Sequence, residues 1–193
     1  MKFRFIVLTA VLLASGSLFA SVTEEEKFSF KLNEGGRLSV SNVNGSITIS
    51  GDDGDSVEII AYKKADNQEQ LDGIKIDISH SADSIAVETD LPESDSWFSR
   101  GNQHGQVRYE ILAPAGTNLD SIETANGRVT LRLPQDANVN VDADTLNGGI
   151  NGRDFDLEAD KGLVGKDLNG DIGNGSARLN IDTVNGSIKI RSN

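Results

Sequence analysis

Carboxylates are the most abundant side chains in this sequence that could take part in chemistry. The 193 residues include 30 Asp and Glu, 18 Lys and Arg, two His and no Cys, and the formal net charge is −12. Without cysteine, a disulfide framework, a thiolate metal site and a cysteine nucleophile are excluded. The negative charge argues against binding to nucleic acids and to anionic membranes, because both depend on clustered Lys and Arg.

Three Asp-rich stretches, residues 51–55, 142–144 and 154–156, could supply oxygen ligands to calcium. Neither of two common calcium patterns is matched. Leu146 stands where the helix-loop-helix pattern needs an oxygen ligand, and Asp154 is displaced by one residue from the Gly-rich calcium repeat. Short carboxylates also favour turns without any metal, so we interpret these residues as structural and predict neither a metal nor a cofactor.

The sequence shows no recognisable catalytic set. Paired carboxylates carry little information in so acidic a chain, although a glycosidase would need them. No Ser/His/Asp order can be singled out. His80 follows a predicted strand and His104 lies in a polar loop, so we interpret both as surface residues. We therefore predict that the protein is not an enzyme.

The loop at residues 92–105 is the strongest candidate for binding, because it contains the single tryptophan. Trp97 and Phe98, with Arg100 close by, could stack on a sugar ring or anchor a partner protein. Alternatively, the two aromatic side chains fold back and cover an open end of the β core, which is the interpretation we favour.

Apolar residues alternate with polar ones along most of the chain, which is typical of strands with one buried face. The segments are rich in Val and Ile, whose branched side chains suit a pleated sheet. A short helical turn is expected only at residues 65–72, ended by Gly73. The predicted strands lie around residues 38–40, 47–49, 57–61, 74–78, 85–87, 107–111, 129–133, 139–141, 155–157, 179–181 and 188–190.

A repeated Asn-Gly dipeptide separates these strands. Both residues tolerate positive φ, so the pair predicts tight turns. The spacing of the later copies resembles the coils of a β-solenoid or β-helix, whereas a β-sandwich of hairpins is the second choice. Residues 114–117 are a candidate subdivision, because Pro and Gly interrupt the alternation there. The principal turns are Asn44-Gly45, Asn126-Gly127, Asn147-Gly148, Asn169-Gly170 and Asn185-Gly186, and two further copies begin at Asn151 and Asn174.

The first twenty residues have the order of a secretory signal peptide. Lys2 and Arg4 precede an apolar stretch at residues 5–14, and small residues follow. We predict cleavage near Ala20, with a neighbouring cleavage site or an uncleaved anchor as alternatives. Residues 21–193 would then form one exported β-repeat domain with 16 basic and 30 acidic residues, net −14.

Six short motifs occur in order along the chain: FSF at 28–30, GGRLSV at 35–40, VNGSITI at 43–49, VRYEI at 107–111, PAGT at 114–117 and TVNGSIKI at 183–190. Together they resemble the bacterial "putative adhesin" family of exported β-strand-repeat domains of unknown function. The resemblance spans residues 28–193 and implies an all-β repeat fold in a periplasmic or cell-surface setting, with no catalytic residues to carry over.

From these observations we expect a non-enzymatic adhesion, scaffold or binding module of the cell envelope. Its partner would be a protein or a glycan and not a nucleic acid, and the mature chain would have no transmembrane segment. Open sheet edges could also support self-association. The alternative is a carbohydrate-active enzyme of the β-solenoid type that uses clustered carboxylates, and it requires a groove where two or three carboxylates converge with a Lys or Arg.

Overall fold

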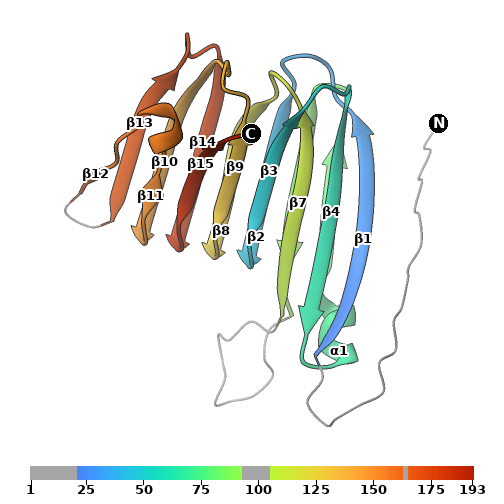
Figure 1. Ribbon diagram of the computed structural model, residues 1–193. Coiled ribbons are helices and arrows are strands. Elements are labelled where there is room, and N and C mark those ends of the chain that lie inside the picture. Colours follow the sequence, from blue (N-terminus) through green and yellow to red (C-terminus); the bar gives the residue numbers. More distant parts are fainter. Residues whose placement is uncertain (1–20, 93–104, 163–164) are drawn as a thin grey trace.

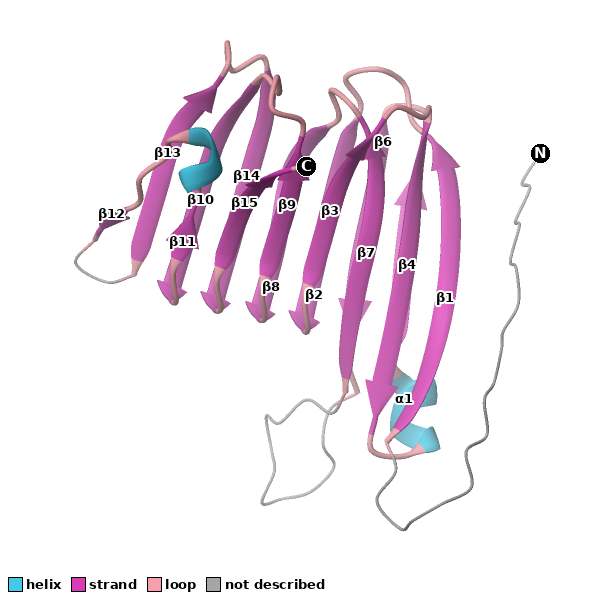
Figure 2. Ribbon diagram, in the orientation of Figure 1, coloured by secondary structure: helices cyan, strands magenta, loops and turns pink. Residues whose placement is uncertain are grey.

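The chain folds into two β-sheets that pack face to face. The computed structural model describes residues 21–92, 105–162 and 165–193 (Figure 1). Almost all of these residues lie in strands or tight turns, with one short helix and one 3₁₀ turn (Figure 2). The prediction of an all-β fold is therefore confirmed. Within the described residues, no helix is long and apolar enough to span a membrane.

Both sheets are mixed, and each is open at its two edges. In spatial order, the seven-stranded sheet consists of β1 (Val22–Lys31), β4 (Ser56–Ala65), β7 (Gln106–Pro114), β3 (Ile47–Asp52), β9 (Val129–Leu133), β15 (Ile188–Ser192) and β11 (Ile150–Asn151). The eight-stranded sheet consists of β12 (Asp160–Lys161), β13 (Lys166–Ile172), β10 (Val139–Asn147), β14 (Ala177–Asn185), β8 (Asn118–Asn126), β2 (Arg37–Asn44), β6 (Ser84–Asp90) and β5 (Lys75–His80).

The core lies between the sheets and follows from the period-two pattern. Alternate residues of the strands point inward, and most of them are Ile, Leu and Val with almost no exposed surface. Some polar contacts are enclosed with them, among them the contact between the hydroxyl oxygens of Tyr109 and Thr89, which are 2.7 Å apart. Desolvation by burial raises the pKa of Tyr109 to about 12, so its hydroxyl stays protonated at neutral pH.

Asn-Gly pairs form corners between the sheets. β2, β8, β14 and β10 belong to the eight-stranded sheet, and each passes through an Asn-Gly pair into a strand of the other sheet, β3, β9, β15 and β11 respectively. The four strands before the corners are parallel and in register, and they end side by side in Figure 1. These turns are therefore not hairpin turns, because the strands on either side of each turn do not pair with each other.

Positive φ, the expected reason for Asn-Gly at the turns, does not explain most of the corner glycines. Of the four corner glycines, only Gly45 has a positive φ, at 119°, and no corner asparagine does. At Gly186, a Cβ atom would overlap the carbonyl oxygen of Gly127 in the next corner. Close approach between stacked backbones, and not a left-handed conformation, thus excludes larger residues there.

The solenoid expected for the second half is wrong, and the second choice, a β-sandwich, fits the structure. In a solenoid, successive coils would stack in sequence order. Here the last repeat, β14 with β15, lies between β8–β9 and β10–β11. The final strands therefore lie between pairs of strands that precede them in the chain, which spacing along the sequence could not show.

The expected helical turn is present as α1 (Gln68–Gly73), and the side chain of Asn67 accepts a hydrogen bond from the backbone N–H of Gln70. This N-cap begins the helix slightly later than the composition suggested. Residues 114–117 lie at the connection from β7 to β8. Each sheet contains strands that precede this connection in the chain and strands that follow it.

Charged residues protect the edge strand β1. Lys63 on β4 is 8% exposed, points between the sheets, and forms ion pairs with Glu24 and Glu26 of β1. Inward-facing charges at an edge oppose pairing with another strand, because added chains would bury them. Self-association through this edge is therefore disfavoured.

Candidate binding face on the eight-stranded sheet

Every strand of the eight-stranded sheet contributes one residue to a single row on the outer face, and seven of the eight are acidic. Backbone pairing places the members next to one another, and each is exposed. Neighbouring strands lie about 4.8 Å apart, so the row is a closely spaced line of carboxylates. In order, the acidic row consists of Asp160, Asp167, Asp144, Asp182, Glu123, Ser41, Glu88 and Asp77.

A second row on the same face is apolar. It lies two residues further along the central strands, immediately before the Asn-Gly corners, and consists of Val43, Ala125, Val184 and Leu146. Leu146 is 51% exposed and Val184 is 43% exposed, which makes them two of the three most exposed large apolar residues of the described chain. The apolar row lies on the same face as the acidic row because residues i and i+2 of a strand point to the same side of the sheet.

The two rows line one open hollow with a volume of about 490 Å³. Glu123, Asp144, Asp167 and Asp182 line it together with the apolar row. Lys166 also lines the hollow. A single cation therefore accompanies four carboxylates among the residues that form this hollow.

Burial and, secondarily, repulsion between carboxylates raise the pKa of two members of the acidic row, Asp182 and Asp144. Burial raises the pKa of Asp182, and the charges of Asp144, Glu123 and Asp142 raise it further. The pKa of Asp144 is also raised, first by burial and then by Asp142 and Asp167. At neutral pH these groups are charged at some cost to folding, because the folded state favours their protonated forms.

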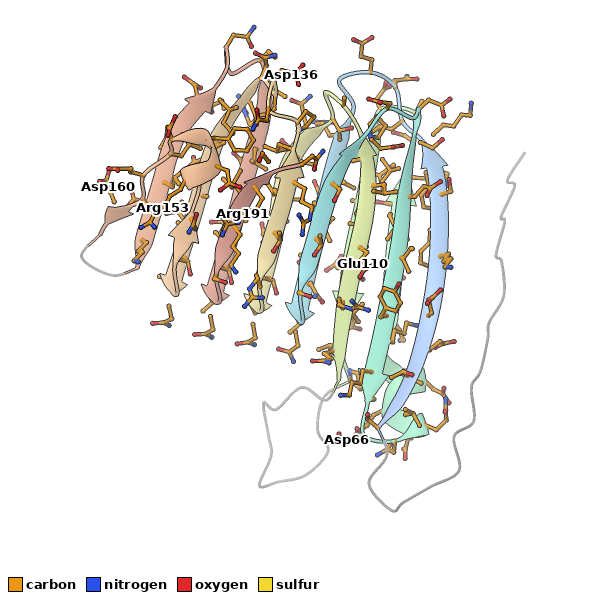
Figure 3. The ribbon with its side chains drawn as sticks, in the orientation of Figure 1. Asp66, Glu110, Asp136, Arg153, Asp160 and Arg191 are labelled. Atoms are coloured by element: carbon orange, nitrogen blue, oxygen red, sulfur yellow. The ribbon has the colours of Figure 1, made fainter. Side chains whose placement is uncertain are left out.

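On the opposite face of the sandwich, some carboxylates form ion pairs with basic side chains. On the outer face of the seven-stranded sheet, Arg108 pairs with Glu110 at 2.8 Å and Lys27 pairs with Glu25 at 2.9 Å. Figure 3 labels Glu110 on β7 of this sheet. In the described part of the chain, no ion pair includes a member of the acidic row. Ion pairs thus neutralise Glu25 and Glu110 on one face, whereas the carboxylates of the acidic row on the other face have no ion-pair partner among the described residues.

An asparagine ladder fixes the relative position of the strands that carry both rows. The side-chain amide of Asn126 donates to Asn44 at 2.8 Å, Asn185 donates to Asn126 at 2.9 Å, and Asn147 donates to Asn185 at 3.0 Å. Asn44 donates in turn to the carbonyl of Gly105 at 3.4 Å. Because the ladder joins equivalent atoms of four corners, it holds the strands in register, and the rows stay straight.

Three of the four corners share a local motif that could have revealed the acidic row. Residues 123–127 read ETANG, residues 144–148 read DTLNG and residues 182–186 read DTVNG. Each acid stands three residues before the corner asparagine, followed by a Thr that points inward and is buried. The parallel register of the corners was the missing information, since it converts this repeated position into a row.

The predicted site residues are distributed over several places. The dipeptides at Asn44, Asn126, Asn147 and Asn185 lie at the corners, whereas Asn169 and Gly170 lie inside β13, so this pair is not a turn. Its glycine instead gives room to Leu157, whose Cδ2 would be 2.8 Å from an added Cβ. Trp97, Phe98, Arg100 and His104 lie outside the described residues, as do residues 1–20.

Two of the three Asp-rich stretches, residues 51–55 and 154–156, lie mostly in turns and contain carboxylates that bind protein groups, whereas residues 142–144 lie inside β10. Asp52 accepts from the backbone of Gly54 at 3.1 Å, and Asp55 pairs with Lys31 at 2.8 Å. Asp154 pairs at 3.0 Å with Arg191, which Figure 3 labels on β15. Within the described ranges, no group of three or more His, Asp or Glu side chains is arranged to hold a metal ion.

The ring of His80 stacks on Phe30, with the ring centroids 4.4 Å apart. His80 therefore contacts an apolar side chain at one end of the sandwich. It stands at the end of β5, away from the four corner strands that carry the apolar row.

Comparison with known proteins finds remote relatives in structure. No family model and no curated protein sequence matches this chain. Among solved structures, a "putative cell adhesion protein" from Clostridium sporogenes is similar, with 15% identity over 88% of this chain and 100% of that chain, and a TM-score of 0.38.

Two further structures carry related names. A "putative adhesin" from Parabacteroides distasonis shares 10% identity over 86% of this chain and 65% of its own, with a TM-score of 0.29. Another from Bacteroides fragilis shares 7% identity over 86% of this chain and 96% of its own, with a TM-score of 0.25. These names are of the same kind as the family that the sequence motifs resemble. The similarities are too remote to assign a site or an activity.

Proposed function

We propose that this chain is an exported, non-enzymatic module of the cell envelope that binds a partner through the outer face of its eight-stranded sheet. One observation carries the proposal: an acidic row and an exposed apolar row lie side by side on that face. The carboxylates of the acidic row form no ion pair in the described structure, although their charges oppose folding. Features that cost stability and serve no packing role are typical of functional surfaces.

Export is the second part of the proposal. The order of charged, apolar and small residues at 1–20 supports a signal peptide that is removed near Ala20, leaving residues 21–193 as the mature domain. An acidic surface suits an exported protein, since net charge keeps such proteins dispersed. The loop with Trp97, Phe98 and Arg100 is a further candidate contact in this proposal.

Cell fractionation combined with partner recovery tests the proposal. The native protein should be found in the periplasmic or surface fraction, and immobilised wild-type protein should retain an envelope component. The double variant Asp144→Asn with Asp182→Asn should lose that component. Glu25→Gln with Glu58→Gln, a change of equal charge on the other sheet, should retain it. Recovery of the native protein in the cytoplasm would contradict export, and equal retention by both variants would contradict the binding face.

A carbohydrate-active enzyme is the second candidate, and one observation favours it. Lys166 lies in the same hollow as four carboxylates, two of which, Asp144 and Asp182, have a raised pKa. A glycosidase, however, needs an acid and a second carboxylate on opposite sides of the bond that is cleaved. Here the carboxylates stand on one wall in a straight row, so binding is the better supported function. Release of reducing ends from envelope polysaccharides by wild type, and not by Asp182→Asn, would reverse this order.

A further inference from the structure

We propose that the occupant of this face is a cationic amphipathic helix from a partner protein. The inference rests on the proposed function and specifies the chemistry of the partner. The apolar side of the helix would lie on Val43, Ala125, Val184 and Leu146, and its Lys and Arg side chains would face the acidic row.

The charge and the apolar residues of this face determine which side chains a partner must offer. Leu146 and Val184 are about half exposed and continuous with Val43 and Ala125, so a partner must offer apolar surface to this row. The adjacent residues Glu123, Asp182 and Asp144 carry no ion pair in the described structure, and their repulsion would be relieved by basic groups. A neutral apolar partner would leave these charges beside it without compensation.

The geometry favours a helix over an added strand. A strand binds at a sheet edge through backbone hydrogen bonds, whereas the two rows lie on a face, where the backbone groups of the sheet are already paired. A helix satisfies its own backbone and needs only side-chain contacts. The apolar row crosses four strands, a span of about 14 Å, which corresponds to roughly ten helical residues.

The two rows also match the width of one helix. They are two residues apart along each strand, about 7 Å, which is within the reach of neighbouring side chains on a helix about 10 Å across. Beyond the apolar row lies the uncharged asparagine ladder. Basic residues are therefore expected along one side of the apolar stripe of the partner, and neutral polar residues along the other.

A designed peptide of about 14 residues, with Leu on one helical face and Lys on the other, is the probe. Its affinity for the purified protein would be measured by fluorescence anisotropy. A scrambled peptide of equal composition and a Leu–Glu peptide are the controls. The protein should bind the Leu–Lys peptide at least about tenfold more tightly than either control, and added salt should weaken the binding. Equal binding of the scrambled peptide would overturn the proposal.

Two variants and two matched controls locate the site. Asp144→Asn with Asp182→Asn, and separately Leu146→Ser with Val184→Ser, should each weaken binding about tenfold or more. On the other sheet, Glu25→Gln with Glu58→Gln removes the same number of charges, and Leu112→Ser makes the same kind of apolar-to-polar change at one position; both should alter affinity less than about twofold. Leu112 is a suitable control because it is 41% exposed.

Thermal unfolding of each variant keeps the test interpretable. The Asn variants should be at least as stable as wild type, because they remove repulsion, so weaker binding cannot result from unfolding. If the Ser variants bind the peptide normally, the face binds through its charge alone and the proposal is wrong. It is also wrong if the acidic and apolar variants abolish dimer formation by the protein itself while peptide affinity is unchanged, because the occupant is then a second copy of the chain.

Failure of this inference and failure of the proposed function give different results. If wild type retains an envelope component through this face and still ignores the Leu–Lys peptide, only the helix is excluded. If wild type is absent from the envelope or retains nothing there, the proposed function itself fails.

Discussion

Two adjacent glycines, Gly148 and Gly149, test whether close approach between neighbouring corners is the reason for glycine there. Only Gly148 lies against the backbone of the neighbouring corner. A Cβ on Gly148 would overlap the carbonyl oxygen of Gly186 in the neighbouring corner, whereas a Cβ on Gly149 would meet nothing within 4 Å. Gly148→Ala must therefore separate the corner before β11 from the corner before β15. Gly149→Ala makes the same chemical change one residue later without this clash.

The magnitude follows from the bonds on either side of Gly148. The amide of Gly186 donates to the carbonyl of Asn147 at 3.0 Å, and the amide of Ile188 donates to the carbonyl of Gly149 at 2.9 Å. Loss of both bonds costs about 2 kcal/mol, and the backbone displacement adds about 1–3 kcal/mol. Gly149→Ala should be neutral or stabilising by up to about 1 kcal/mol, since it restricts the unfolded chain.

Urea denaturation of both variants, followed by circular dichroism, measures the difference. We expect Gly148→Ala to lower the free energy of unfolding by about 3–5 kcal/mol relative to Gly149→Ala, a large part of the stability of a typical domain. The slope of the transition should stay unchanged. Equal midpoints for the two variants would refute the explanation of corner glycines by close approach.

Three further predictions concern the acidic row, the ladder and the core. Asp182→Asn should raise the free energy of unfolding at neutral pH by about 0.2–1 kcal/mol. Because burial and neighbouring carboxylates raise the pKa of Asp182 in the folded state, the gain should vanish at acid pH, and a gain that persists there would show that the charge of Asp182 is not its cause. Asn174 should deamidate before Asn126 during alkaline incubation, measured by peptide mass spectrometry, because both side-chain polar atoms of Asn126 are bonded within the ladder; the reverse order would refute protection. Tyr109→Phe should cost about 1–2 kcal/mol, and its effect should be smaller in a Thr89→Val background, where no hydroxyl is left unpaired; full additivity in denaturation experiments would show that the 2.7 Å contact contributes nothing.

Most strands could be predicted from sequence because their signal is local, but β1, β8 and β13 were not among the predicted strands, and the strand predicted at residues 155–157 is wrong because a 3₁₀ turn lies there. In β7, Val107, Tyr109 and Ile111 alternate with polar residues and are all buried, as the period-two pattern indicates. The same pattern cannot say which sheet a strand joins. Asn44-Gly45 looks like a hairpin turn from its residues alone, and only the pairing of β2 with β8 and of β3 with β9 shows that it is a corner.

The order of the repeats and the candidate site depend on long-range pairing. β14 lies between β8 and β10 although it follows both in the chain, and no local feature of residues 177–185 encodes that position. The acidic row depends on the same pairing, because Glu123 and Asp182 are 59 residues apart in sequence and adjacent in space. Residue types at repeated positions were visible in the sequence, and the register that aligns them was not.

Site-specific photo-crosslinking in native cells tests the central claim most directly. A photoreactive phenylalanine analogue would replace Val184 in the apolar row or, as the matched control, Leu112 on the opposite sheet; the two side chains are similarly exposed, at 43% and 41%. We predict a discrete crosslinked envelope product from position 184 and none from position 112. Equal products from both positions, or a product from position 112 alone, would contradict the assignment of the eight-stranded sheet as the binding face.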